Sequence, residues 1–92
     1  MVYLTRIHMS PSGRGHEHIS RVEWKQPGTG KSGESTLAEM VAFIEQQKGE
    51  VKVTDGRNTV EVGVVRQAPL APHLRTHADG KWTDNLLALP RF

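Results

Sequence analysis

A glycine-rich segment in the first half of the chain comes closest to a motif with known chemistry. Gly28-Thr29-Gly30-Lys31-Ser32 is similar to the end of a phosphate-binding loop, in which glycine, four residues and Gly-Lys-Ser/Thr follow one another. That pattern requires glycine at position 25, where this chain has Lys25. The helix expected after this segment also begins too late for its first amides to hold a phosphate. Residues 26–34 are therefore interpreted as a flexible, solvated glycine-rich loop.

Histidines are frequent in this chain, and neutral imidazole is a common metal ligand. The five are His8, His16, His18, His73 and His77. If residues 16–24 form a strand, His16 and His18 share one face at a spacing that suits a metal ion. The chain has no cysteine, and no pattern joins the two groups of histidines, so surface histidines are favoured and no metal or cofactor is expected.

Acid, base and nucleophile candidates are present without a motif that joins them. Serines stand in expected loops, and Glu17, Asp79 and Asp84 are the carboxylates considered for acid–base work. A domain of this size also seldom encloses a ligand pocket, because its core is used for folding. We expect a protein without enzymatic activity.

Basic residues and a tryptophan are the alternative candidates for a binding face. They are Arg6, Arg14, Arg21, Lys25 and Lys31, with Trp24. Basic side chains contact phosphates and an aromatic ring stacks on a base, so this set would suit a nucleic acid. Acidic Glu17, Glu23 and Glu34 interrupt the set, and the net charge is only +2. This pattern favours a solvated face of mixed charge.

The strands that must position these residues follow from alternating apolar and polar residues. Val2 to Met9 and residues 16–24 each have strand character and are expected to form an antiparallel hairpin across a turn. Residues 50–54 and 59–65 predict a second hairpin with one valine face. Gly63 replaces a side chain within the second of these strands and is interpreted as a bulge.

A single helix is the clearest prediction. Thr36-Leu37-Ala38-Glu39 matches a capping box, in which the Thr and Glu side chains bond to amides of the first turn. A stripe of apolar residues at helical spacing follows, formed by Leu37, Met40, Val41 and Ile44. Gly49 suits a left-handed helix end.

The predicted fold class is α+β, with a small antiparallel sheet of four to five strands and one amphipathic helix packed on one face. The order is ββαββ, and a proline-containing connection at 67–72 then leads to a C-terminal edge strand at 73–77. Ninety-two residues supply one hydrophobic core, so residues 1–92 are expected to form a single compact domain.

The last part of the chain carries the most specific pattern, Leu74-Arg75-Thr76, then Asp79, then Asp84-Asn85-Leu86-Leu87-Ala88-Leu89-Pro90. It resembles the ending of a bacterial and phage family known as a domain of unknown function, number thirty-eight ninety-two. That family usually has tyrosine where this chain has His73. The resemblance implies a compact domain often carried by phages or prophages, and no activity or catalytic residues.

Simple chemistry favours a structural role for the polar residues of this ending. Asp84 is placed to cap the turn that begins at Asn85, and Arg75 to pair with Asp79 or Asp84. The leucines that follow would close one end of the core. Buried polar groups in such an arrangement must find partners.

The leading functional hypothesis is a non-enzymatic protein-binding or interaction module that acts through an exposed sheet edge or the glycine-rich loop. The expected partner is an unidentified protein, with a bacterial host protein as one candidate. A homodimer through the same edge is equally allowed. Nucleic-acid binding by Arg14, Trp24, Lys25 and Lys31 is the alternative. Without a signal peptide or a long apolar segment, the chain is expected in the cytoplasm and away from membranes.

Overall fold

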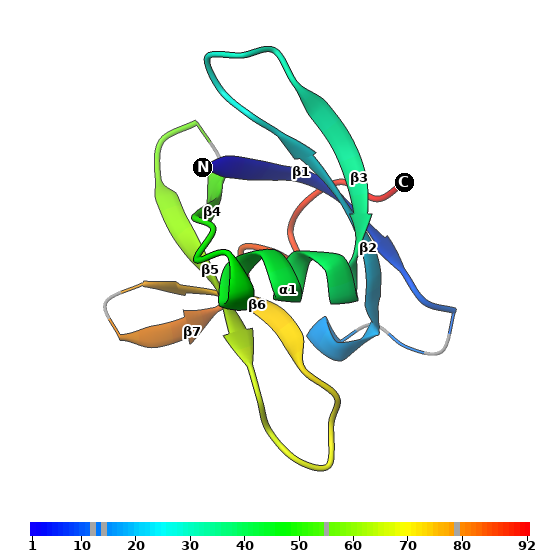
Figure 1. Ribbon diagram of the computed structural model, residues 1–92. Coiled ribbons are helices and arrows are strands. Elements are labelled where there is room, and N and C mark those ends of the chain that lie inside the picture. The colour runs from blue at the N-terminus through cyan, green and yellow to red at the C-terminus, as the bar shows by residue number, and fades with distance from the viewer. Residues whose placement is uncertain (12, 14, 55, 79) are drawn as a thin grey trace.

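The computed structural model describes residues 1–11, 13, 15–54, 56–78 and 80–92. In these residues seven strands form one sheet, in the order β3-β2-β1-β4-β5-β6-β7, with one α-helix (Figure 1). The strands are β1 (Val2–Met9), β2 (Ile19–Lys25), β3 (Ser32–Thr36), β4 (Val51–Thr54), β5 (Thr59–Val65), β6 (His73–Ala78) and β7 (Lys81–Thr83). The helix α1 is Leu37–Gln46, and a short 3₁₀ helix, η1, is His16–His18. The α+β class is confirmed, but the sheet is larger than four to five strands.

The sequence pattern predicts an antiparallel sheet, but the centre of the sheet contains a parallel pair. β1 pairs antiparallel with β2 on one side and parallel with β4 on the other, where Val2 lies opposite Val51 and Tyr3 opposite Lys52. A parallel pair needs a long crossover connection, which the segment through β3 and α1 supplies. Hydrophobic alternation identifies strands but does not reveal which strands become neighbours, so this mixed topology was missed.

Two strands lie where loops or turns were expected. Ser32, Gly33 and Glu34, assigned to the flexible loop 26–34, belong to β3 and pair with β2. The remaining loop is a hairpin connection in which Gln26 N donates to Lys31 O. The short strand β7 pairs with β6. Neither strand has the apolar alternation from which strands were predicted. Each forms because it pairs with a neighbouring strand, β3 with β2 and β7 with β6.

Two local predictions were wrong. His16 and His18 do not share a strand face, because both belong to η1, where His16 is buried and His18 is partly exposed. Gly63 forms no bulge, since β5 and β6 keep a regular register through it. A Cβ at Gly63 would lie 3.3 Å from the Trp82 ring, so this glycine provides room for an aromatic side chain. The register irregularities lie between β1 and β2 instead.

The helix begins as predicted and ends differently. Thr36 and Glu39 form both hydrogen bonds of the capping box. At the other end it is Lys48 that adopts the left-handed conformation, with φ of 53°, and not Gly49. Gly49 is required for space, because a Cβ there would lie 2.2 Å from the Phe43 ring. Of the predicted apolar stripe, only Met40 is fully buried.

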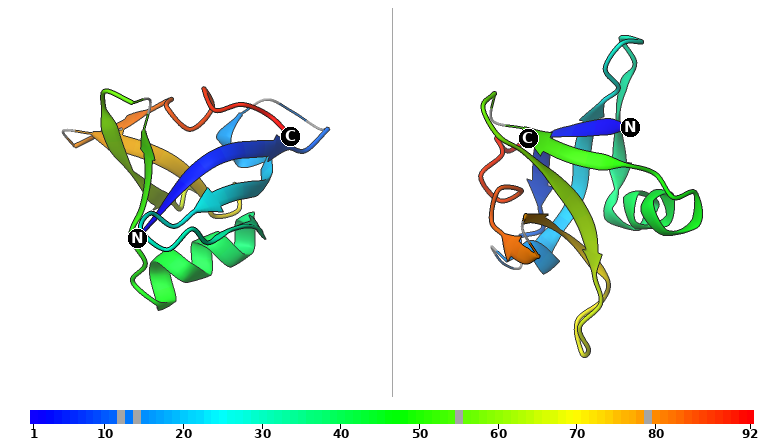
Figure 2. Two further views of the ribbon diagram at one scale, coloured as in Figure 1. Left: turned by 90° about the horizontal axis from the view of Figure 1, so that it is seen from above. Right: turned by 90° about the vertical axis from the view of Figure 1, so that its left-hand side faces the viewer.

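The C-terminal segment, residues 84–92, crosses the side of the sheet opposite to α1 (Figure 2). Its Leu86 is completely buried in the core formed by the strands and Met40. Beyond the point where β4 leaves β1, the segment takes the place of β4: Ile7 N donates to Pro90 O, and Phe92 N donates to Ile7 O. The helix and this segment thus enclose the twisted sheet from both sides.

We expect Leu86→Ala to lower the free energy of unfolding by about 2–5 kcal/mol, because it removes buried methyl groups and leaves a cavity. Leu87→Ala is the matched control, since Leu87 is only partly buried in the same segment. Urea unfolding of the two variants measures the difference. Equal losses would contradict the role given to Leu86 as the anchor of the C-terminal segment.

Candidate functional site

The strand β3 forms one edge of the sheet and runs directly into α1 (Figure 1). Just before β3, Gln26 N donates to Lys31 O, and this pair continues the register of β2 and β3. In an antiparallel ladder the hydrogen-bonded pairs recur at every second residue. Gly33 and Ser35 are therefore the β3 residues whose backbone groups bond to β2.

The alternate residues of β3 present their backbone to the outside. By the same alternation, the N–H and C=O groups of Ser32 and Glu34 point away from β2. Thr36 N, at the end of the strand, donates to Glu39 Oε1 at 2.9 Å within the capping box. The free edge is thus a short ladder of donors and acceptors centred on Ser32 and Glu34, closed at one end by the start of the helix.

Trp24 covers the face of β3 that looks toward the helix. It lies directly opposite Gly33, and a Cβ at Gly33 would be only 2.8 Å from Trp24 Cζ2. The indole Nε1 donates to Ser35 Oγ at 3.1 Å, which fixes the ring across the strand. Because Gly33 has no side chain and Ser35 has a small one, the indole ring extends over β3 toward its edge.

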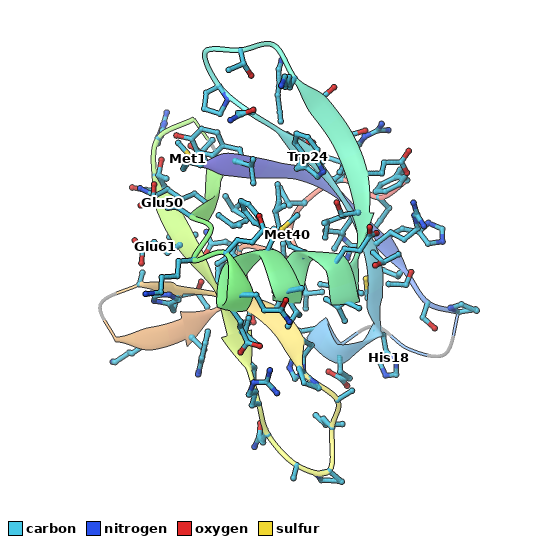
Figure 3. The ribbon with its side chains drawn as sticks, viewed as in Figure 1. Met1, His18, Trp24, Met40, Glu50 and Glu61 are labelled. Carbon is cyan, nitrogen blue, oxygen red and sulfur yellow. The ribbon has the colours of Figure 1, made fainter. Side chains whose placement is uncertain are left out.

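An apolar pocket of about 370 Å³ lies beside this ring, between the sheet and α1. Its apolar lining comes from Met1, Val2, Trp24, Met40 and Phe43. Figure 3 shows Met1, Trp24 and Met40 on the same side of the sheet, with Met40 reaching up from the helix. The volume is at the low end for ligand pockets and suits one or two large apolar side chains. A pocket of this size is more than a chain of this length is expected to enclose.

The opposite face of the same strands carries charges. Glu23 accepts two hydrogen bonds from Arg6 and one from Thr5, and these bonds lower the pKa of Glu23 to about 2. Glu34 lies directly opposite Glu23 in the ladder. Its ion-pair partner among the described residues is Arg21, at 4.0 Å. The two faces of β3 therefore differ, one being apolar and the other charged.

The residues proposed for interaction do not form one face. Trp24 and Lys25 are consecutive in β2, so their side chains point to opposite sides of the sheet. Lys31 lies in the hairpin connection just before β3, and Arg14 lies outside the described residues. Trp24 alone joins the pocket, and the stacking face with neighbouring lysines has no geometric support in the described residues.

A second groove of about 570 Å³ lies on the other flank of α1. Leu37 and Val41 of the helix face Ala71 and Pro72 of the 66–72 connection across it. The groove runs mainly along a helix and a loop, and the strands contribute only Ser20 and Thr36 to its lining. It offers packing surface without the backbone donors and acceptors that β3 provides.

The polar residues of the C-terminal pattern gather where β6 meets β7. Arg75 Nε donates to Thr83 O at 3.1 Å, and Arg75 Nη2 donates to Asp84 Oδ1 at 2.9 Å. Thr76, fully buried, bonds to Thr83 through its hydroxyl. Asn85 O accepts from Ala88 N in the turn that follows. Of the two carboxylates considered for Arg75, Asp84 is its partner here, and Asp79 lies outside the described residues.

His16 and His73 are buried beside this cluster, whereas the sequence pattern favours surface histidines. The His16 side chain is only 9% exposed, and its Nε2 lies 3.8 Å from Asp84 Oδ1 and has no hydrogen-bond partner among the described residues. His73 Nδ1 donates to Ala71 O at 3.0 Å. Burial lowers the pKa of His16, and the positive charge of Arg75 lowers it further. Within the described ranges, no three histidine or carboxylate side chains are grouped to hold a metal ion.

These features define a small α+β domain in which a seven-stranded mixed sheet carries one helix, an open edge and an adjoining apolar pocket. The chain belongs to the family described as Protein of unknown function (DUF3892), which it matches over residues 3–90. No curated protein and no solved structure matches it. In the part of the chain that the structure describes, no helix is long and apolar enough to cross a membrane.

We expect the free energy of unfolding to fall when the pH is lowered from about 7 to 5, in part because of His16. Its pKa is lowered in the folded state from the ordinary value of 6.5, so the unfolded chain takes up this proton first. The stabilisation is present above pH 6.5 and is lost as the pH falls toward the lower folded pKa.

Urea unfolding of the wild-type chain and His16→Gln at several pH values measures this contribution, and His77→Gln, at a more exposed histidine, is the control. The loss should be smaller in His16→Gln than in the control. An identical pH dependence in all three proteins would show that the burial of His16 is not linked to stability.

Proposed function

We propose that this domain is a protein-binding module that accepts an extended segment of a partner as an additional strand along β3. The observation that carries the proposal is the combination of a free strand edge with the Trp24 ring laid over Gly33. Strand addition obtains its affinity from main-chain hydrogen bonds and its specificity from pockets for alternate side chains. Both requirements meet at β3.

The geometry supports binding of a side chain in the apolar pocket. A guest residue opposite Gly33 would have its side chain on the same face as Trp24, because directly opposite residues of an antiparallel pair share a face. No β3 side chain stands between that residue and the indole. A large apolar guest residue would therefore contact Trp24 and reach toward Met40.

The other edge of the sheet supports docking less well. β7 contains three residues, against five in β3, and so provides a shorter ladder. Trp82 is 47% exposed there, but its ring packs against His77 at a centroid distance of 5.5 Å and over Gly63. The apolar pocket beside Trp24 receives no lining residue from β7.

The setting of this binding is part of the proposal. The C-terminal pattern of the chain is typical of bacterial and phage proteins, and the absence of cysteine suits a reducing compartment. We therefore propose that this domain is of phage or prophage origin and binds a bacterial host protein in the cytoplasm. Binding without catalysis is consistent with the sequence, in which no catalytic motif was found.

Glu34→Pro tests the edge directly. Proline removes the outward N–H of residue 34, and prolines are tolerated on edge strands whose N–H faces solvent. We expect the variant to stay folded but to lose binding to peptides selected by the wild-type domain from a random library of peptides about ten residues long. Isothermal titration with the selected peptides gives the affinities.

Glu34→Thr is the matched control, because it also removes the carboxylate but keeps the backbone N–H and has high strand propensity. Thermal unfolding establishes that both variants are folded. Retention of the selected peptides by Glu34→Pro at wild-type affinity would refute strand addition at β3, as would a library from which the wild-type domain selects nothing.

A further inference from the structure

The two faces of β3 favour different side chains at neighbouring positions of a guest strand, and this difference limits which guest sequences can bind. Consecutive residues of a strand point to opposite faces. A guest residue opposite Gly33 looks toward Trp24 and the apolar pocket, and the next one, opposite Glu34, looks toward the charged face. The site therefore selects for the side chains of two adjacent guest residues, those opposite Gly33 and Glu34.

Among the described residues, the cations that act on Glu34 come from β2 and β1, on the inner side of β3. It lies opposite Glu23, whose carboxylate is already held by Arg6 and Thr5, so one like charge faces another across the ladder. Arg21 approaches Glu34 to 4.0 Å, and Arg6, which is bonded to Glu23, also attracts Glu34. The Glu34 side chain is nevertheless 51% exposed. A cation placed on the outer side of Glu34 would offset the repulsion from Glu23.

We propose that the preferred ligand is an extended peptide in which a lysine or arginine, placed opposite Glu34, is adjacent to a large apolar residue placed opposite Gly33. This inference rests on the strand addition proposed above and specifies its ligand. The basic residue pairs with the Glu34 carboxylate across the new ladder. The apolar residue packs on the Trp24 ring and enters the pocket beside it.

The same carboxylate disfavours a second copy of this chain as the occupant. Antiparallel pairing of β3 with itself over its five residues centres on Glu34 and sets Glu34 opposite Glu34 of the other copy. Like charges directly opposite one another destabilise a strand pair. The edge is therefore arranged for a different strand, one that carries the opposite charge at this position.

The test is a charge exchange between domain and peptide. The random library is selected separately on the wild-type domain and on Glu34→Lys. We expect wild-type selections to be enriched in adjacent basic and apolar residues. On Glu34→Lys the basic residue should give way to an acidic one, while the apolar neighbour remains.

Individual affinities then isolate the pair. Replacing the basic residue of a selected peptide by glutamate should weaken binding to the wild-type domain by about twofold to fivefold, and Glu34→Lys should recover it. Lys25→Gln is the control on the domain, since it alters charge on the same face, opposite Ser32, while leaving Glu34 and its partner Arg21 in place. It should leave the preference for a basic residue unchanged.

The outcomes separate the two proposals. If both domains select the same peptides, and Glu34→Pro loses them, strand addition stands and the proposed basic–apolar preference is wrong. If the wild-type domain selects nothing, both fail together. Sedimentation showing a dimer that Glu34→Pro dissociates would overturn the peptide assignment in favour of a second copy.

Discussion

The parallel pairing of β1 with β4 is the constraint on which the rest of the structure depends. It extends over two residue pairs at the start of β1, and it requires the chain to cross from one side of β1 to the other. The crossover through β3 and α1 leaves β3 at an edge and places the helix beside it. Where β4 diverges, Pro90 and Phe92 bond to Ile7 and complete the other side of β1. Edge, pocket and C-terminal segment are consequences of this one arrangement.

The proposed site depends on where small residues stand relative to an aromatic one. Gly33 allows the Trp24 ring to cross β3, and the hydrogen bond to Ser35 holds it there. Met40, the buried residue of α1, forms the pocket from the other side. The capping box at Thr36 fixes where β3 ends and the helix begins. Edge and pocket are thus positioned by the same short segment of chain.

Sequence reasoning succeeded where an element carries its own signal. β1 and β5 have apolar alternation, and α1 has a capping box, so their starts were found closely. β3 has no apolar residue and exists because β2 pairs with it, so it was assigned to a loop. The contact of Trp24 with Gly33 and the burial of His16 arise from register and topology. A glycine opposite a tryptophan is visible in sequence only once the strand pairing is known.

Amide hydrogen exchange, followed by NMR with and without a selected peptide, tests the central claim most directly. In the free domain the amides of Ser32 and Glu34 should exchange rapidly, while those of Gly33 and Ser35 are protected by β2. Bound peptide should protect Ser32 and Glu34. Binding that protects β7 amides and leaves Glu34 exchanging freely would contradict docking at β3.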